Sequence, residues 1–438
     1  MKNITIIGTG YVGLVSGSGF AEFGHNVICA DIDEEKISKL NSGEIPIYEP
    51  GLERLINRNI NKGTLSFSSD TELAIRSSEV IFIAVGTPQG IDGKADLSAI
   101  ESVANTISKN INTYKLICTK STVPIGAGKW ITSIIKSKNK RKSFDYISNP
   151  EFLREGSSVN DFMHPDRIII GSNGDNEIKK IVKDIYRPIN INRIPILFST
   201  IETAEMIKYS SNAFLSLKIS YINEIANLCD KLGADIHQVT DAMGRDGRIS
   251  PKFLHPGPGF GGSCFPKDTK ALASIGRDHK SPLLTIEAAL KTNSRQRTLM
   301  VKKIKKLLGG KLNGFTISVL GLSFKPQTDD IRGSVASYIV KILQDEGAKI
   351  NAYDPVAIDN FRLIYPSINY FTSWQSAVDN TDACVLFTEW NEFRAIDLSK
   401  LKKLMKTPII LDTKNILNIS ELKKLSFRFD NVGRSNIQ

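Results

Sequence analysis

Short apolar runs alternate with helical segments in the first part of the chain, and this alternation returns near the other end. In the first part, the runs predict strands over residues 3–7, 26–30, 80–85, 115–119, 146–148 and 167–171. In the last part, they predict strands over residues 316–320, 349–353, 383–387 and 408–411. Strands that alternate with helices are typical of parallel sheets covered on both faces. The chain is therefore predicted to be α/β, with two doubly wound domains.

A long helix is predicted between these two halves. Residues 202–232 contain no proline and no internal glycine, and Gly233 follows them. Apolar residues occur nearly all round this helix, which is typical of a helix buried on several sides, and it would suit a domain connector and a dimer core. Further helices are predicted over residues 268–276 and 281–308. The expected domains are a first α/β domain, a central helical domain and a second α/β domain, over residues 1–198, 199–310 and 311–438.

The first predicted strand leads into a glycine motif, Gly8-Thr9-Gly10-Tyr11-Val12-Gly13. In a strand–turn–helix unit, the first glycine allows the turn, the second admits a pyrophosphate and the third lets helix and strand pack. Asp31 comes 18 positions after Gly13, at the end of the next predicted strand. Its carboxylate can accept from both ribose hydroxyls and would repel a 2′-phosphate. These residues predict a Rossmann-like first domain that binds NAD in preference to NADP.

A segment rich in glycine and proline, PGPGFGGSCFPKD, covers residues 256–268. This composition predicts a loop over the whole segment. Cys264 lies in it, and Lys267 and Asp268 follow three and four residues later. A nearby positive charge favours the reactive thiolate, and a carboxylate can act as general base. The alternative is a glycine loop with an inert, buried cysteine.

Polar residues also follow several predicted strands, where ligands bind in open parallel sheets. These residues are Thr87, Thr122, Glu151 and Glu155. Each of them could instead be a turn or helix-cap residue. Lys208 and Asn212 interrupt the long helix four residues apart and therefore share one face. An ammonium and an amide that converge in this way would stabilise an oxyanion, unless the lysine merely reaches water.

The composition is that of an ordinary globular protein. Of the 438 residues, 41% are hydrophobic and 24% are charged, and no apolar run is long enough to cross a bilayer. The first residues lack the features of a signal peptide. Five scattered cysteines indicate a reducing compartment, so we expect a cytoplasmic protein without disulfides. Four of them lie in apolar segments, as small buried residues do. The histidines show no paired spacing, so no metal site is expected.

The net charge is +11, and lysines cluster over residues 136–142 and 302–306. The first cluster is predicted to be a solvated loop and the second the polar face of a helix. Nucleic-acid binding is one interpretation of this charge. Neither cluster contains the interleaved aromatic residues that favour single-strand binding. An acidic small molecule fits the charge at least as well, so neither a nucleic acid nor a membrane is expected as a partner.

Eight segments resemble the nucleotide-sugar 6-dehydrogenase family, and together they span nearly the whole chain. They are GTGYVGLV (8–15), PIYEPGL (46–52), GTP (86–88), KSTVPIG (120–126), NPEFLREGSSVNDFMHPDRI (149–168), AEMIKYSSNAFLSLKISYINEIANLC (204–229), GFGGSCFPKD (259–268) and GLSFKPQTDDIR (321–332). The resemblance implies a four-electron oxidation of a CH₂OH group to a carboxylate, with two NAD per substrate. UDP-glucose is the substrate it favours, and GDP-mannose or a UDP-N-acetylhexosamine is the alternative. A catalytically silent NAD or nucleotide-sugar sensor is the alternative from another class.

The resemblance also implies a catalytic role for individual residues. Cys264 would capture an aldehyde as a thiohemiacetal, and the second oxidation would give a thioester that water releases. Lys208 and Asn212 would hold negative oxygens, and Asp268 would position or deprotonate water. Thr122 and Glu151 would hold a water and assist proton transfer in the first step. The implied catalytic set is Cys264, Lys208, Asn212, Asp268, Thr122 and Glu151.

Binding residues are implied for both ligands. Those for NAD, from the motif and the resemblance together, are Gly8, Gly10, Val12, Gly13, Asp31, Lys36, Thr87, Thr122, Glu155, Lys267 and Arg332. Those for the nucleotide sugar are Glu151, Phe152, Leu153, Arg154, Glu155, Lys208, Asn212, Arg248, Gly257, Gly259, Phe260, Gly261 and Lys325. Arg248 resembles an arginine that reaches the substrate of the neighbouring subunit, which implies a homodimer. Family members often have an arginine after the last strand, where this chain has Lys414, which keeps the charge without the bidentate fork.

Overall fold

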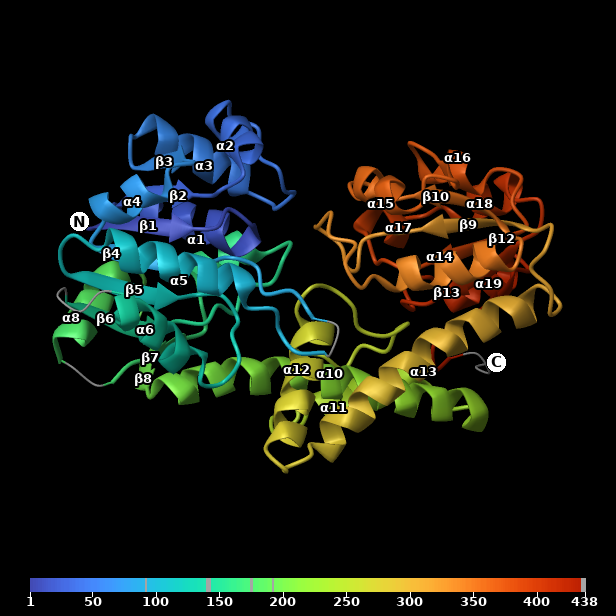
Figure 1. Ribbon diagram of the computed structural model, residues 1–438. Helices are drawn as coiled ribbons and strands as arrows, with labels where there is room; N and C mark the ends of the chain where they lie inside the picture. Colours follow the sequence, from blue (N-terminus) through green and yellow to red (C-terminus); the bar gives the residue numbers. More distant parts are fainter. Residues whose placement is uncertain (91–92, 139–142, 174–175, 191–192, 435–438) are drawn as a thin grey trace. The chain divides into compact units, whose positions relative to one another are not determined.

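The computed structural model describes residues 1–90, 93–138, 143–173, 176–190 and 193–434. The chain forms two compact units, Met1–Ser211 and Asn212–Gln438. Each unit contains one sheet with helices on both faces (Figure 1). The predicted α/β class with two doubly wound sheets and one long helix is confirmed. The division into three domains stays a prediction.

The first unit contains an eight-stranded sheet in the order β3-β2-β1-β4-β5-β6-β7-β8. Neighbouring strands are parallel except β6 and β7, which are joined by an antiparallel pair, Ser148 and Gly171. Its elements are β1 (Asn3–Ile7), α1 (Tyr11–Glu22), β2 (Asn26–Ala30), α2 (Glu34–Asn41), α3 (Leu52–Asn61), β3 (Leu65–Ser68), α4 (Thr71–Ser77), β4 (Val80–Ile83), α5 (Ser98–Asn110), β5 (Lys115–Thr119), α6 (Ala127–Lys138), β6 (Phe144–Ser148), α7 (Ser158–Met163), β7 (Ile168–Gly171), α8 (Asn176–Ile185), α9 (Arg187–Asn190) and β8 (Ile196–Ser199). The analysis of the pattern missed β3 and β8, which are the two edge strands of this sheet.

The long helix α10 (Ile201–Leu232) begins in the first unit and ends in the second. The sheet of the second unit is parallel throughout, in the order β11-β10-β9-β12-β13-β14, which repeats the arrangement of the first six strands. The remaining elements are α11 (Ile236–Gly244), α12 (Phe265–Asp278), α13 (Leu284–Leu307), β9 (Thr316–Leu320), α14 (Val335–Asp345), β10 (Lys349–Tyr353), α15 (Ile358–Ile364), β11 (Asn369–Tyr370), α16 (Trp374–Val378), β12 (Ala383–Leu386), α17 (Asn391–Arg394), α18 (Leu398–Leu404), β13 (Ile409–Asp412), α19 (Ile419–Lys424) and β14 (Arg428–Asp430).

The central strands read as continuous apolar runs because both faces of each sheet are covered. In β4, Val80 and Phe82 join one hydrophobic core, whereas Ile81 and Ile83 join another. This division follows from the alternation of side chains along a strand. The first sheet therefore has a separate apolar core on each face. The loops at the carboxyl ends of its strands are where ligands bind in open parallel sheets.

Two predictions about local structure are corrected. The segment 256–268 is not a loop throughout, because α12 begins at Phe265 and Cys264 is its N-cap. Pro266 is tolerated in the first turn, since that turn needs no hydrogen bond from its backbone nitrogen. Composition alone cannot separate a loop from a helix that begins with a proline.

The second lysine cluster lies on a helix, α13, as predicted, and Lys302 and Lys306 are exposed, but one of its lysines is not on the polar face. Lys303 on α13 is buried, and its Nζ pairs with Asp230 at 2.8 Å and with Asp430 at 2.9 Å. It therefore joins α10 and β14 to α13 and is not part of a solvated face. The first cluster, residues 136–142, lies partly outside the described residues.

The five cysteines are as expected. Cys29, Cys118, Cys229 and Cys384 are buried, Cys264 is partly exposed, and all five are unbridged. Burial raises the pKa of the Cys29 and Cys384 thiols to about 12. These buried thiols are therefore inert. Across the described ranges, no helix has the length and hydropathy that spanning a membrane requires.

Candidate active site

The glycine motif forms the turn between β1 and α1. Gly8 has a φ of +104°, a conformation that other residues rarely adopt. A Cβ atom on Gly13 would lie 1.8 Å from the carbonyl oxygen of Gly8, whereas one on Gly10 would meet nothing within 4 Å. Val12 lies in the first turn of α1. The turn is therefore closed on the side of the strand and open at Gly10, as an anionic ligand at a helix N-terminus requires.

Asp31 directly follows β2 and is hydrogen bonded to the glycine turn. Its Oδ2 accepts from the backbone nitrogen of Thr9 at 2.8 Å and from the Thr9 hydroxyl at 2.7 Å, and Lys36 Nζ lies 3.3 Å away. Burial acts to raise the pKa of Asp31, but these hydrogen bonds, one from Asp33 and the charge of Lys36 outweigh it, so the pKa is lowered. The carboxylate therefore stays ionised as a hydrogen-bond acceptor.

The loops after β4 and β5 are joined at the carboxyl edge of the first sheet. The hydroxyl of Thr87 donates to the carbonyl oxygen of Thr122 at 2.8 Å. Because β4 and β5 are parallel neighbours, both loops leave the sheet at the same edge. These two predicted site residues are thus brought together.

The loop after β6 meets the first part of α10 through a buried ion pair. Lys208 Nζ lies 2.8 Å from Glu151 Oε1, and both side chains are buried. The ring of Phe152 lies under the same ammonium, 5.2 Å from Nζ to the centroid, and 4.0 Å from the guanidinium carbon of Arg167. The attraction between the two charges allows an ammonium and a carboxylate to stay ionised where little water reaches them.

A second buried lysine, Lys120, lies near this pair and was not predicted as a site residue. Its Nζ is 3.4 Å from Asn149 Oδ1, just before the Glu151 loop. Burial lowers the pKa of Lys120 to about 8, with the charge of Glu151 opposing and that of Lys208 adding to the effect. Lys120 directly follows β5 in the KSTVPIG segment, a position that could have indicated a role.

The second unit brings together three other predicted residues around the start of α12. Asn212 Nδ2 donates to Asp268 Oδ2 at 2.7 Å, and Lys267 Nζ lies 2.8 Å from Asp268 Oδ1. Asp268 is fully buried. Cys264 is the residue before the first turn of α12, where the helix dipole favours a thiolate. Its sulfur lies 3.5 Å from the Ser263 hydroxyl.

The glycine loop before Cys264 is held by side chains that sequence reasoning missed. Asn293 on α13 accepts from the backbone nitrogen of Phe260 at 2.8 Å and donates to its carbonyl oxygen at 3.1 Å. Arg297 donates to the same oxygen at 2.8 Å. Gln296 Nε2 donates to the carbonyl oxygen of Gly257 at 2.8 Å. These three polar residues recur at helical spacing in KTNSRQR (291–297), and this pattern could have indicated a polar helix face that holds a loop.

Glycine is needed at two predicted positions of this loop. Gly259 has a φ of +112°, and a Cβ atom there would lie 2.6 Å from Asn293 Oδ1. At Gly261, a Cβ atom would lie 2.3 Å from the carbonyl oxygen of Gly333. The loop therefore follows its neighbours so closely that side chains at these positions would displace it.

Other predicted residues lie apart from these groups or pair within their own loops. Three exposed arginines pair with nearby aspartates, namely Arg154 with Asp161, Arg248 with Asp246 and Arg332 with Asp330. Leu153 and Glu155 lie in the loop after β6, and Lys325 lies over the ring of its neighbour Phe324. Lys414 pairs with Glu389 at 2.9 Å. The guanidinium groups are exposed in all three pairs, but the side chains of Asp161 and Asp330 are only 11% and 4% exposed, so the Arg248–Asp246 pair is the one that contributes little to stability.

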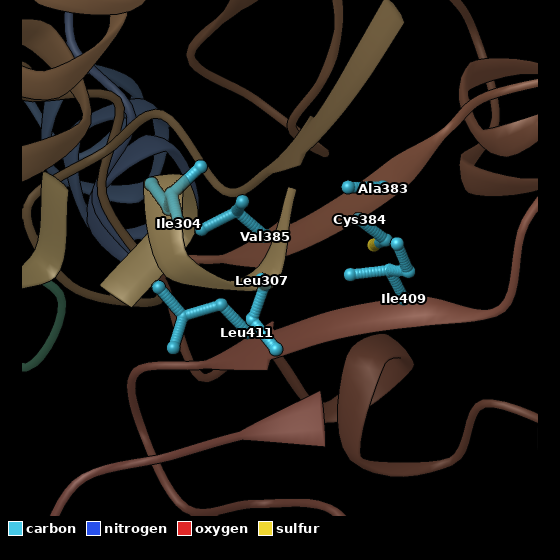
Figure 2. Close-up of a pocket in the computed structure, with 7 residues that line it drawn as sticks. All are labelled: Ile304, Leu307, Ala383, Cys384, Val385, Ile409 and Leu411. Carbon is cyan, nitrogen blue, oxygen red and sulfur yellow. The ribbon is translucent and has the colours of Figure 1, made fainter. Parts of the chain in front are cut away.

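The pocket drawn in Figure 2 is not part of these groups. It is lined by apolar side chains of α13, β12 and β13, including Ile304, Cys384 and Leu411. The volume open to a water-sized group is about 0 Å³. The pocket is thus a packing gap in the second unit. Within the part of the chain that the structure describes, no cluster of His, Cys, Asp or Glu could hold a metal ion.

Comparison with known proteins gives matches over nearly the whole chain. Three descriptions of the UDP-glucose/GDP-mannose dehydrogenase family match, the NAD binding domain over residues 2–190, the central domain over residues 202–295 and the UDP binding domain over residues 318–419. A UDP-glucose 6-dehydrogenase of Rhizobium meliloti (strain 1021) is 47% identical over 433 residues, 98% of this chain and 99% of the relative. UDP-glucose 6-dehydrogenase TuaD of Bacillus subtilis (strain 168) is 46% identical over 440 residues, covering 100% and 94%.

Solved structures agree with this assignment. A UDP-glucose dehydrogenase from Pyrobaculum islandicum superimposes with a TM-score of 0.91 at 34% identity, covering 99% of this chain and 98% of that one. A UDP-D-ManNAc dehydrogenase from Pyrococcus horikoshii gives a TM-score of 0.87 at 27% identity, covering 99% and 100%. The resemblance predicted from the motifs is thereby confirmed. The matches span both sheets and the long helix between them, and the chain belongs to the UDP-glucose/GDP-mannose dehydrogenase family.

Proposed function

We propose that this protein oxidises the CH₂OH group of UDP-glucose to the carboxylate of UDP-glucuronate, with two NAD per substrate. The names of the relatives support UDP-glucose over other nucleotide sugars. The observation that carries the proposal is the group at the start of α12. Asp268, four residues after Cys264, is buried there and accepts a hydrogen bond from Asn212. This group supplies a nucleophile, an amide donor and a base, which oxidation of an aldehyde to an acid needs.

The residues of the first unit fit NAD. The turn is open at Gly10, and the Asp31 carboxylate is ionised at the end of β2, where the two ribose hydroxyls would donate to it. NAD, when bound, supplies the hydride acceptor for each oxidation. The other residues proposed to hold it are Gly8, Val12, Gly13, Lys36, Thr87, Thr122, Glu155, Lys267 and Arg332.

The first oxidation needs a group that takes the hydroxyl proton of the alcohol. We assign this to Glu151, acting with a water held by Thr122, because its carboxylate is buried beside the Lys208 ammonium. Lys208 would then stabilise the alkoxide as it forms, since a preorganised cation is strong where water is excluded. The alcohol carbon loses a hydride and its oxygen a proton, which leaves an aldehyde.

The second oxidation proceeds through Cys264. Its sulfur bonds to the aldehyde carbon, and the oxygen takes a proton to give a thiohemiacetal. Loss of a hydride and of that proton gives a thioester, to which water adds, and the thiolate leaves. Asn212 would donate to the oxyanion, and Asp268 would take the proton of the water. The hydrogen bond from Asn212 to Asp268 orients both side chains before substrate binds.

The nucleotide sugar is proposed to contact two loops and one lysine, which lies in the loop after β9. The loops contain Glu151 to Glu155 and Gly257 to Gly261, and the lysine is Lys325. Residues 318–419 match the UDP binding domain of the family, which supports Lys325 as a contact to the UDP group. Asn293 hydrogen bonds to both the backbone nitrogen and the carbonyl oxygen of Phe260, and these bonds hold the backbone that positions the Phe260 ring.

The protein is proposed to be a homodimer. On α10, Phe214, Tyr221, Leu228 and Leu232 expose 59%, 47%, 50% and 73% of their surface. At 100° per residue these positions fall within about 40° of one another, so they form one apolar stripe. We propose that a second copy of the chain covers this stripe. Arg248, 90% exposed, is proposed to reach the substrate of the partner subunit.

A cytoplasmic location fits the five unbridged cysteines, since disulfides form in oxidising compartments. The deciding experiment is the yield of NADH with limiting UDP-glucose and excess NAD. Two NADH per sugar are expected for the four-electron reaction. One NADH would mean that the reaction ends at the aldehyde, and none would reject UDP-glucose. GDP-mannose and UDP-N-acetylmannosamine are the comparison substrates. If either is turned over faster than UDP-glucose, it becomes the proposed substrate.

A further inference from the structure

The PIYEPGL segment, residues 46–52, has no role in the function proposed above. It precedes α3 and contains no regular secondary structure until Leu52. Glu49 in this segment is only 5% exposed. A carboxylate is costly to bury unless strong hydrogen bonds compensate for the lost water. The contacts of Glu49 therefore indicate what the segment does.

Both oxygens of Glu49 accept backbone hydrogen bonds from one distant segment, where the loop after β6 leads into α7. The nitrogen of Gly156 donates to Oε2 at 2.7 Å, and the nitrogen of Ser158 donates to Oε1 at 2.9 Å. These donors lie 107 and 109 residues further along the chain. Gly156 has a φ of +79°, a left-handed conformation that glycine adopts easily, and the loop turns there just before α7 begins. Glu49 holds the loop directly at this turn.

Two other carboxylates, both close to the loop in sequence, accept hydrogen bonds from its backbone. Leu153 donates its N–H to Glu151 Oε2 at 2.5 Å, and Arg154 donates its N–H to Asp161 Oδ2 at 2.9 Å. Of the three carboxylates that hold this loop, Glu49 alone comes from a distant part of the chain. Glu49 and the buried Glu151–Lys208 pair therefore both hold the loop against distant parts of the first unit, and Glu49 does so through the backbone.

We propose that Glu49 is a positioning residue that holds residues 151–158 in the shape that binds the nucleotide sugar. The inference rests on the proposed function, because the same loop contains Glu151 and Phe152, which that function places at the substrate. Glu49 does not itself touch a reacting atom. It acts through the backbone, and the Glu151–Lys208 pair depends on the loop it supports.

The change that isolates this role is Glu49→Gln, which keeps the size of the side chain. It replaces one acceptor oxygen by an amide that cannot accept, and it removes the charge from the other hydrogen bond. We expect the KM for UDP-glucose to rise about tenfold or more, since the loss of one charged hydrogen bond corresponds to a tenfold change or greater. The KM for NAD should rise less than the KM for UDP-glucose, because the NAD residues around Gly10 and Asp31 are untouched and Glu155 is the one proposed NAD residue in this loop.

Two further variants complete the test. Glu53→Gln, on the exposed side of α3, removes an equal charge four residues away and should leave both KM values unchanged. Glu49→Asp keeps the charge with a shorter reach and should restore part of the affinity for UDP-glucose. If Glu49→Gln does not fold, Glu49→Asp is measured in its place against wild type. Equal rises in both KM values, or no rise for UDP-glucose, would overturn the proposal.

Hydrogen exchange separates this inference from the function on which it rests. In the free protein, the backbone N–H groups of Gly156 and Ser158 should exchange faster in Glu49→Gln than in wild type. Those of α1 should not change. If wild type does not oxidise UDP-glucose, the proposed function fails, and unchanged exchange at Gly156 and Ser158 would show separately that Glu49 does not hold the loop.

Discussion

Glu205 provides a pH-dependent test of the structure. This buried residue of α10 accepts from the backbone nitrogens of Gly126 at 2.6 Å and Gly128 at 2.8 Å, at the start of α6. Burial raises the pKa of Glu205 from 4.5 to about 7, against the two N–H groups, which lower it. The neighbouring charges oppose each other, since Glu202 raises the pKa and Lys129 lowers it. The ionised form is therefore costly in the folded protein.

The sign and size of the effect follow from linkage. Because the pKa in the folded protein is above that of the unfolded chain, the contribution to stability is complete below pH 4.5. It is lost as the pH rises through about 7. Moving the pKa from 4.5 to about 7 corresponds to about 3 kcal/mol. Glu205→Gln cannot titrate, so wild type should lose up to this free energy relative to the variant between pH 5 and pH 8.

The assay is thermal unfolding of both proteins at a series of pH values. For a domain of 150–250 residues, about 2–4 °C corresponds to 1 kcal/mol, so the Tm of wild type relative to Glu205→Gln should fall by roughly 6–12 °C. Asp96→Asn is the control. Hydrogen bonds from Ser98 lower the pKa of the Asp96 carboxyl, so its contribution to stability changes only at a pH below the test range, and the Tm difference between wild type and Asp96→Asn should stay constant between pH 5 and pH 8. A constant difference between wild type and Glu205→Gln would refute the reasoning.

Three further changes test the proposed chemistry and assembly. Cys264→Ser should abolish steady-state production of UDP-glucuronate while calorimetry still detects binding of NAD and UDP-glucose, and near-normal turnover would exclude Cys264 as the nucleophile. Asp31→Ala should raise the KM for NAD about tenfold or more, because the ribose loses a charged acceptor, and an unchanged KM for NAD would contradict the cofactor site. Leu228→Asp would place a charge in the apolar stripe of α10 and should convert a dimer to a monomer in analytical ultracentrifugation, whereas a wild type that is already monomeric would reject the dimer.

The NAD half of the site could be predicted from local sequence. Gly8, Gly10 and Gly13 lie within six residues. Gly8 is needed for its backbone conformation and Gly13 for the close approach of helix and strand, whereas Gly10 leaves the turn open to a ligand. Asp31 follows at the end of the next strand, so one strand–helix–strand unit contains all four positions. The strands themselves could be recognised because sheets covered on both faces require unbroken apolar runs. Local sequence suffices where neighbouring residues determine the geometry.

The start of α12 shows the limit of this reasoning. Glycines and prolines predict a loop up to Asp268, but a proline in the first turn of a helix is as acceptable as one in a loop. The difference decides whether Cys264 is a residue of a loop or the N-cap of a helix. Packing of the buried face of α12 determines the result, and that packing is not visible in the composition of the segment.

Only the tertiary structure decided which side chains are partners. Glu151 pairs with Lys208, Asn212 with Asp268 and Glu49 with the loop at Gly156, over 57, 56 and 107 residues of sequence. The sequence alone determined the type of fold, the NAD motif and the chemical groups available for catalysis. The first two partnerships depend on the face of α10 that Lys208 and Asn212 occupy, and the third depends on how the segment before α3 packs against the segment before α7. Such contacts arise when distant segments pack together, because a buried charge or amide must then find its partner among the groups that packing brings within reach.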